Sequence, residues 1–232
     1  MVEYDNRFCS VKGDILISPD TVEHLIGLYP VFNELSAEDR AQLIRKIRIR
    51  KFEKGSVLKS RKTALEEVCV VMDGYLRITT SEKNSQLLLF YIPKDDCCLL
   101  TAPRLCQSQA LKYEISCPVD TVLLTIDDDA FLQLEETYPQ IRNAVDNRLA
   151  RQLEELIFFL DVKVRSSQLD QLYYYLKYLA RVFKTDELRI THELIGQDML
   201  IRREIVSRLL TELRSLGRID MSRNRIIVKD FS

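Results

Sequence analysis

The stretch of sequence that decides the fold of this chain is Thr191–Val228, THELIGQDMLIRREIVSRLLTELRSLGRIDMSRNRIIV. A threonine with Glu193 close behind it is typical of a helix start, and this short helix should end near Met199. A second helix is predicted over Arg202–Leu216, where Gly217 stops it. Two helices joined by so short a turn predict a helix-turn-helix.

The residues after the second helix add a wing. Segments 218–221 and 225–228 are predicted to form two short strands around a turn at 222–224. Residues 201–232 hold eight Lys or Arg against four Asp or Glu, although the whole chain has a net charge of −1. A local basic excess of this kind is typical of proteins that bind nucleic acid, so the pattern predicts a winged helix-turn-helix that binds DNA.

The second helix has an apolar face and a polar face. Its polar face near the helix start is the part that enters the major groove in proteins of this class. Arg can grip guanine with two hydrogen bonds, Glu can accept one from cytosine, and Ser can contact a base or a phosphate. The alternative is a solvated face on which Glu204 pairs with Arg208. We favour DNA contact, and the predicted contacting residues are Arg203, Glu204, Ser207, Arg208, Arg202, Thr191, His192 and Arg225.

The residues before this region predict a sensor domain and a connecting helix. The length of 232 residues suits two domains. Short segments rich in β-branched and aromatic residues alternate with turn signals and predict an antiparallel β-roll; they are Val68–Met72, Tyr75–Thr80, Gln86–Ile92 and Thr121–Ile126. We expect an α+β protein with a sensor domain at 1–127, a linker and dimerisation helix at 128–163, and a DNA-binding domain at 164–232.

A long helix is predicted from Pro139 to about Val162. Its apolar residues recur at steps of three and four; they are Ile141, Val145, Leu149, Leu153, Leu156 and Leu160. A stripe this narrow suits a coiled-coil seam, so we expect the chain to form a homodimer along it. The alternative is that the stripe lies on the β-domain of its own chain.

The chain shows no secretory signal and no apolar stretch of the roughly 20 residues that span a bilayer, so we expect a cytoplasmic protein without membrane contact. Its six cysteines have no regular spacing and are expected to remain thiols. No nucleophile–base pairing or phosphate-binding loop indicates an enzyme. With only His24 and His192 in the chain, a metalloenzyme of the cupin kind is not indicated either.

The order of these parts resembles that of the Crp/Fnr transcription regulators across nearly the whole chain. The most specific stretch is HELIGQDMLIRREIVSRLL, in which Arg203, Glu204 and Arg208 match the family's Arg-Glu-x-x-x-Arg motif. The Ser207–Arg208 pair is similar to the Fnr-type variant, which implies a half-site containing TGA or a close relative. Leu200 stands in the turn where the family often has glycine.

The resemblance extends upstream through PVFNELSAED, FEKGSVL and VVMDGYLRI, with Gly55 and Gly74 at expected turns. It implies a roll like those of cyclic-nucleotide-binding domains, a double-stranded β-helix. It also implies double-stranded DNA, a second copy of the chain and an unknown small-molecule or redox effector as partners, with RNA polymerase as a further candidate. A protein-binding adaptor is a remaining alternative, and the outward charged set on the second helix argues against it.

The effector is not indicated by the sequence, and the cofactor is unknown. Cyclic-nucleotide members hold their ligand with a glutamate and an arginine, and the matching places here hold Leu100–Thr101 and Leu111–Lys112. Cyclic AMP would therefore lose its main polar anchors. Thiols could instead sense oxidants or bind an iron–sulfur cluster or zinc. Core packing is the alternative for these candidate sensor thiols, which are Cys97, Cys98, Cys106 and Cys117.

Overall fold

The structure is a computed structural model that describes residues 19–59, 65, 67–80, 86–101, 113–222 and 225–229. Its residues cluster into two units, one of Met1–Ile78 and Tyr91–Gln152 and the other of Thr79–Phe90 and Leu153–Ser232. Among the described residues, no helix combines the length and the apolar character needed to cross a membrane.

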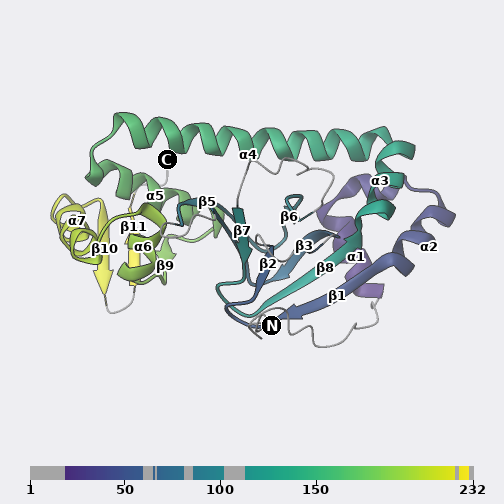
Figure 1. Ribbon diagram of the computed structural model, residues 1–232, viewed down its shortest axis with the longest axis horizontal. Coiled ribbons are helices and arrows are strands. Elements are labelled where there is room, and N and C mark those ends of the chain that lie inside the picture. The colour runs from purple at the N-terminus through teal and green to yellow at the C-terminus, as the bar shows by residue number, and fades with distance from the viewer. Residues whose placement is uncertain are drawn as a thin grey trace, which may run out of the picture. The chain divides into compact units, whose positions relative to one another are not determined.

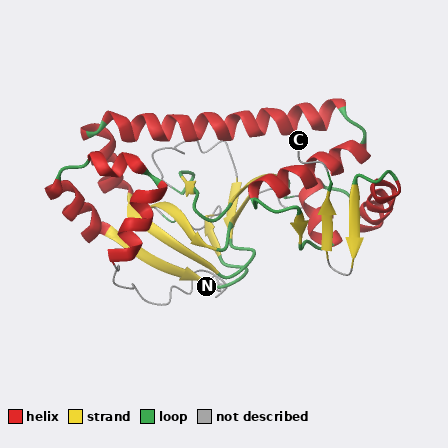
Figure 2. Cartoon of the chain, turned by 180° about the vertical axis from the view of Figure 1, so that it is seen from behind, coloured by secondary structure: helices red, strands yellow, loops and turns green. Residues whose placement is uncertain are grey.

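The N-terminal part of the chain combines short helices with two small sheets (Figures 1 and 2). Its helices are α1 (Pro19–Leu28), the 3-10 helix η1 (Pro30–Glu34), α2 (Ala37–Lys46) and α3 (Asp128–Thr137). Its strands are β1 (Ile47–Phe52), β2 (Val57–Lys59), β3 (Glu67–Asp73), β4 (Leu76–Thr80), β5 (Leu88–Ile92), β6 (Cys97–Cys98), β7 (Tyr113–Ser116) and β8 (Thr121–Asp127). They pair in the orders β1-β8-β3-β6 and β2-β7-β4-β5. This is the antiparallel roll that the sequence predicts.

Local sequence signals explain where these elements begin. Ser36 caps α2 by accepting a hydrogen bond from the backbone of Asp39, and Asp127 caps α3 in the same way through Ala130. The two predicted turn glycines, Gly55 and Gly74, have φ values of +87° and +79°. These are left-handed conformations that glycine adopts without steric cost.

The two faces of the sheet β1-β8-β3-β6 have different partners. Side chains alternate along a strand, so Val68 and Val70 point to one face of the sheet and Cys69 and Val71 to the other. Val68 and Val70 belong to a core cluster with residues of α1, η1 and α3, including Leu25, Phe32 and Phe131. Cys69 and Val71 are fully buried on the opposite face, which is the interior of the roll.

The long helix α4 (Pro139–Arg165) follows α3 and starts at the proline that the sequence places there. Ile141 is 2% exposed and Val145 is 7% exposed, because both belong to the core cluster of the first unit. Leu149 packs partly against the same cluster. These three residues therefore lie on the β-domain of their own chain. For Ile141 and Val145 this placement corrects the expectation that they line a dimer seam, since they have almost no surface left for a partner.

The rest of α4 presents a different apolar stripe. Leu153, Ile157, Leu160 and Val164 follow one another at steps of four, three and four, and they are 58%, 57%, 63% and 81% exposed. Leu156, which the sequence assigns to the seam, is half-buried instead. We call the four exposed residues the exposed seam.

The C-terminal part of the chain contains the helices α5 (Gln168–Val182), α6 (His192–Met199) and α7 (Arg203–Ser215). Its strands β9 (Glu187–Leu188), β10 (Ile219–Ser222) and β11 (Arg225–Val228) form an antiparallel sheet in the order β10-β11-β9. Ser167 caps α5 through the backbone of Asp170. Three consecutive tyrosines, Tyr173–Tyr175, lie on α5, and Tyr175 is only 4% exposed, so it packs in the interior of this unit.

Candidate nucleic-acid interface

The helix α6 begins where the sequence predicts. The hydroxyl of Thr191 accepts a hydrogen bond from the backbone N–H of Leu194 at 3.2 Å and so caps the helix. One buried and one part-buried contact hold the other end. Tyr175 of α5 donates a 2.6 Å hydrogen bond to the carboxylate of Asp198, and Nζ of Lys163 on α4 donates to the carbonyl of Met199 at 3.0 Å. Burial lowers the pKa of Lys163. Neighbouring helices therefore fix the position of α6.

The turn between α6 and α7 depends on Leu200 in the turn and on Gly196 in the helix before it. Leu200 is left-handed, with φ 57° and ψ 42°, which is a conformation uncommon for a side chain of this kind. The chain then folds back so closely that a Cβ placed on Gly196 would lie 2.7 Å from the carbonyl oxygen of Ile201. A glycine at position 196 is thus what lets the turn approach the helix.

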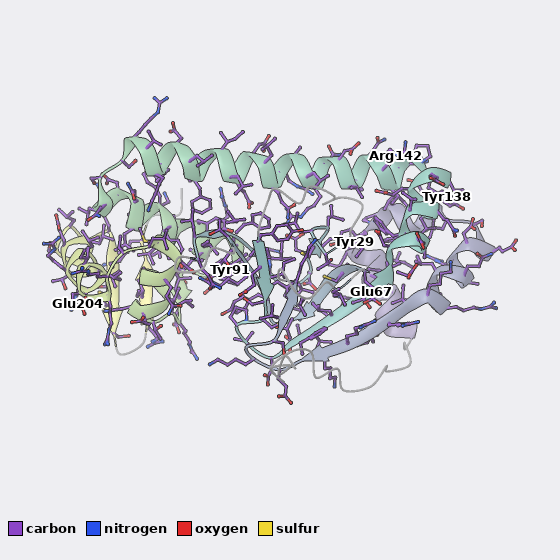
Figure 3. The ribbon with its side chains drawn as sticks, in the orientation of Figure 1. Tyr29, Glu67, Tyr91, Tyr138, Arg142 and Glu204 are labelled. Carbon is purple, nitrogen blue, oxygen red and sulfur yellow. The ribbon has the colours of Figure 1, made fainter. Side chains whose placement is uncertain are left out.

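The helix α7 presents the predicted charged set to solvent. Val206, Leu209, Leu210 and Leu213 are at most 5% exposed and pack inward. Arg202, Arg203, Glu204 and Arg208 are all exposed near the helix start, and Glu204 is labelled in Figure 3. Gly217 follows the helix with φ +71° and ends it. The hydrophobic pattern of the sequence therefore orients this helix correctly.

Ser207 differs from the rest of the predicted contact set because its hydroxyl already has partners. It donates a hydrogen bond to the carbonyl of Arg203 at 3.1 Å and lies 2.8 Å from Nδ1 of His192. The second contact joins α6 to α7. Ser207 and His192 are both half-buried, so this pair contributes to the packing of the two helices against each other.

A groove of about 270 Å³ brings four predicted residues together at the wing. Thr191, His192, Arg203 and Arg225 line it, although they come from α6, α7 and β11. Helix starts and cationic side chains are the groups that usually contact DNA phosphates. Arg202, Glu204, Ser207 and Arg208 do not line this groove.

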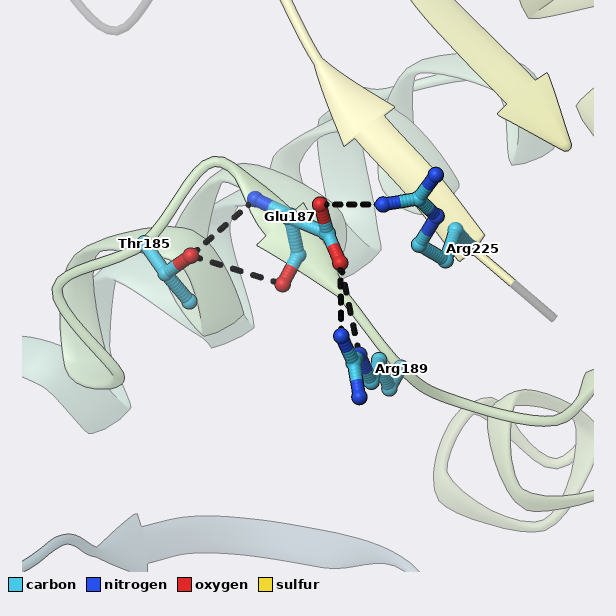
Figure 4. Close-up of polar contacts among 4 residues, drawn as sticks. All are labelled: Thr185, Glu187, Arg189 and Arg225. Carbon is cyan, nitrogen blue, oxygen red and sulfur yellow. Dashed lines mark hydrogen bonds and ion pairs between the residues drawn. The ribbon is translucent and has the colours of Figure 1, made fainter.

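Arg225 has an acidic partner that sequence reasoning missed (Figure 4). Its guanidinium donates to Glu187 of β9 at 2.8 Å, and Arg189 donates to the same carboxylate at 3.2 Å. The hydrogen bond from Arg225 is the main reason why the pKa of Glu187 lies below its usual value. Glu187 and Arg225 are 38 positions apart in the sequence, and the pairing of β9 with β11 brings them together.

The candidate sensor thiols do not form a common site in the part of the chain that the structure describes. Cys98 and Cys117 are completely buried, Cys97 is half-buried, and Cys106 lies outside the described residues. Cys98 pairs across the sheet with Cys69, which the sequence did not single out. Burial raises the pKa of Cys97. Among the described residues, no three His, Cys, Asp or Glu side chains are grouped so that they could hold a metal ion.

The structure describes Leu100 and Thr101, which stand where cyclic-nucleotide-binding relatives are expected to have a glutamate. Thr101 is completely buried, and its hydroxyl donates a hydrogen bond to the carbonyl of Cys98 at 3.0 Å. Thr101 has no carboxylate, so it cannot bind the ribose of a cyclic nucleotide as a glutamate would. Leu111 and Lys112, at the position of the missing arginine, lie outside the described residues.

A roll, a long helix and a winged helix-turn-helix in this order define the fold of the Crp/Fnr transcription regulators, and the chain has this fold. A crp/fnr regulator from Eubacterium rectale is 21% identical, with a TM-score of 0.72, covering 89% of this chain and 96% of that one. CLP of Xanthomonas campestris, a c-di-GMP-responsive global regulator, is 15% identical, with a TM-score of 0.69 and coverages of 84% and 100%.

A mutant of CooA from Carboxydothermus hydrogenoformans is 19% identical, with a TM-score of 0.68 and coverages of 88% and 92%. No family model matches the chain, and no curated protein matches its sequence. The likeness to these structures therefore concerns the fold.

Proposed function

We propose that the chain is a sequence-specific transcription regulator that binds a palindromic DNA site as a homodimer. The observation that carries this proposal is the exposed set Arg203, Glu204 and Arg208 at the start of α7, backed by a fully apolar inner face. Residues 164–232 would bind DNA, residues 1–127 would hold the effector, and residues 128–163 would link and dimerise them. Two recognition helices in a dimer would contact half-sites one DNA turn, roughly 34 Å, apart.

Selection from random-sequence DNA with the purified full chain tests this function directly. We expect a two-fold symmetric motif, with a half-site related to TGA if the resemblance of the recognition helix holds. A pool that returns no motif would favour the adaptor alternative, in which the winged helix binds a protein.

Replacing Arg208 with alanine should weaken binding by about 1–3 kcal/mol for each half-site and relax the preference at the same base pair of each half-site. The reason is that an exposed arginine near the helix start can form two hydrogen bonds to one guanine. Fluorescence anisotropy on a panel of single-base variants measures this. Arg214→Ala, on the last turn of the same helix, is the matched control and should leave base preference unchanged. An equal loss on every sequence for Arg208→Ala would contradict a base-reading role.

Replacing Glu187 with glutamine should raise affinity for all DNA sequences several-fold. The change removes a negative charge beside the phosphate-binding groove and frees Arg225 from its carboxylate partner. One additional phosphate contact in each subunit also makes the dependence of log K on log salt steeper by about 0.9 per subunit, or about 1.8 for the dimer. Binding titrations at several salt concentrations measure both effects. Glu67→Gln, in an ion pair with Arg50 in the first unit, is the control and should change neither. An unchanged salt slope would show that removing the Glu187 carboxylate does not add a phosphate contact by Arg225.

The roll is proposed to sense an effector other than a cyclic nucleotide. What supports this is the absence of a carboxylate at Leu100–Thr101 and the engagement of the Thr101 hydroxyl within the protein. Thermal unfolding with and without cyclic AMP tests it, because a ligand that binds only the folded state raises the melting temperature. We expect no shift with cyclic AMP, and a concentration-dependent shift would overturn this part of the proposal.

A further inference from the structure

The first unit contains a cavity of about 440 Å³ that the proposed function does not yet use. It lies on the face of the sheet that carries Val68 and Val70, opposite the interior of the roll, and between that face, α1, η1, α3 and α4. The interior of the roll is where the resemblance places a cyclic nucleotide. This cavity is therefore a separate space, and its volume is within the range of small-molecule sites.

Most of the cavity wall is apolar. Leu25, Leu28, Phe32, Leu99, Ile126 and Phe131 line it together with the two valines of β3. Small-molecule sites are usually clefts with mainly apolar walls and a few polar groups. A space of this size with such a wall fits the apolar body of a ligand.

The charged groups at the cavity neutralise one another. A guanidinium nitrogen of Arg148 on α4 lies 2.5 Å from a carboxylate oxygen of Asp96, and Asp95 accepts a contact from His24 at 3.0 Å. Arg151 is exposed at the rim. Because both carboxylates are already paired with cationic or polar partners, the wall holds no strong excess of either charge.

One donor in the wall has no partner in the part of the chain that the structure describes. Nε of Arg148 is buried and makes no hydrogen bond among the described residues, although the other end of the guanidinium is paired. A buried donor without an acceptor is costly, and a ligand oxygen would satisfy it. Tyr29, labelled in Figure 3, also lines the cavity, and its phenol donates a long, 3.5 Å hydrogen bond to the carbonyl of Asp95.

The cavity also disfavours anions. Burial is the main reason why the pKa values of Tyr29 and Cys97 both lie above their usual ranges. An ionised carboxylate on a ligand would meet the same loss of solvation, and Arg148, the cation nearest to it in the wall, is already paired with Asp96.

We propose that this cavity binds an uncharged, largely apolar small molecule that carries one hydrogen-bond acceptor oxygen, taken up by Nε of Arg148. The molecule is the effector of the regulator, and this last point rests on the proposed function. Since α4 forms part of the cavity wall and continues without a break to Arg165, occupancy acts on the helix that carries the exposed seam.

The probe for this site is prodan, an uncharged naphthalene ketone whose emission shifts to the blue in apolar surroundings. The full chain contains no tryptophan, so the probe can be excited without interference from indole emission. We expect saturable binding of one prodan per chain. Competition should show that 2-acetylnaphthalene displaces prodan, that 2-isopropylnaphthalene does so about tenfold more weakly because it lacks the acceptor oxygen, and that 2-naphthoate does not.

Two variants place the probe in this cavity. Ala144→Phe fills space at the wall formed by α4 and should weaken prodan binding at least tenfold, whereas Ala41→Phe, on an exposed position of α2, should not. Arg148→Lys keeps a cation for Asp96 but removes the Nε donor, so it should abolish the tenfold preference for 2-acetylnaphthalene over 2-isopropylnaphthalene. Arg142→Lys, an exposed arginine of the same helix outside the wall, is its control. Circular dichroism confirms that each variant is folded.

The outcomes separate this inference from the proposed function. Absent prodan binding, equal binding by Ala144→Phe, or preference for 2-naphthoate would each overturn the ligand class or the site. Binding of the selected DNA is measured on the same preparation. If DNA binding is intact while prodan fails, the cavity proposal alone is wrong. If prodan binds as expected but no DNA motif exists, the site stands and the regulator function falls.

Discussion

Replacing Ile157 with lysine should convert the chain from a dimer to a monomer and weaken binding to the full palindrome by about 10²–10⁴-fold. Ile157 lies in the middle of the exposed seam and is 57% exposed, so the change removes only part of a buried surface inside the chain. In a symmetric dimer, two lysines would face each other where two apolar side chains should meet. Loss of the second half-site contact removes the avidity of a bivalent complex.

Lysine is chosen because the helix itself should tolerate it. Glu154 lies three residues before position 157, so it can pair with the new cation, whereas Asp161, four residues after it, already pairs with Arg165. Sedimentation equilibrium measures the oligomeric state, and anisotropy on full and half sites measures DNA binding. Leu216→Lys, at a 56% exposed leucine outside the seam, should leave the dimer intact. A dimer that persists in Ile157→Lys would show that the exposed seam is not the interface.

Replacing Gly196 with alanine should destabilise the second unit by about 1–3 kcal/mol and impair DNA binding on every sequence. Alanine is ordinarily better than glycine in a helix by about 1 kcal/mol. Here, however, the added methyl group would lie 2.7 Å from the carbonyl oxygen of Ile201, which is a backbone atom that can move only if the turn moves. Displacing that turn changes the angle at which α7 leaves α6.

Gly27→Ala in α1 gives the opposite expectation. Among the described residues, and apart from the backbone of its own helix, no heavy atom lies within 4 Å of a Cβ built at Gly27, so alanine should stabilise by up to about 1 kcal/mol. Urea unfolding followed by hydrogen exchange of the α1 and α7 amides assigns each change to its unit. If both substitutions stabilise the protein, the close approach of Ile201 to Gly196 does not constrain the turn.

Local signals in the sequence predict much of the fold because they act within a few residues. The caps at Ser36, Thr191 and Ser167 and the first-turn proline at 139 mark helix starts that the structure confirms. The apolar face of α7 is likewise evident from periodicity, because every inward residue recurs at helical spacing. The roll and the winged helix-turn-helix follow from such signals in order along the chain.

Contacts between distant residues are what the sequence does not reveal. The stripe along α4 is continuous in the sequence, yet Val145 is covered by its own chain and Leu160 is not. Periodicity shows that a face is apolar but does not show what covers it. The same limit explains why Glu187 was missed as the partner of Arg225. It also hides the cavity at Arg148, whose wall is assembled from five separate segments.

The division of α4 into a covered half and an exposed half has a consequence for dosage. The covered half is held by its own chain, whereas the exposed seam in the proposed dimer is satisfied only by a second molecule. At concentrations below the dimer dissociation constant, the amount of dimer rises with the square of the chain concentration, and so does occupancy of the DNA site. A twofold change in synthesis would then change occupancy about fourfold, which makes the level of expression itself an input to the switch.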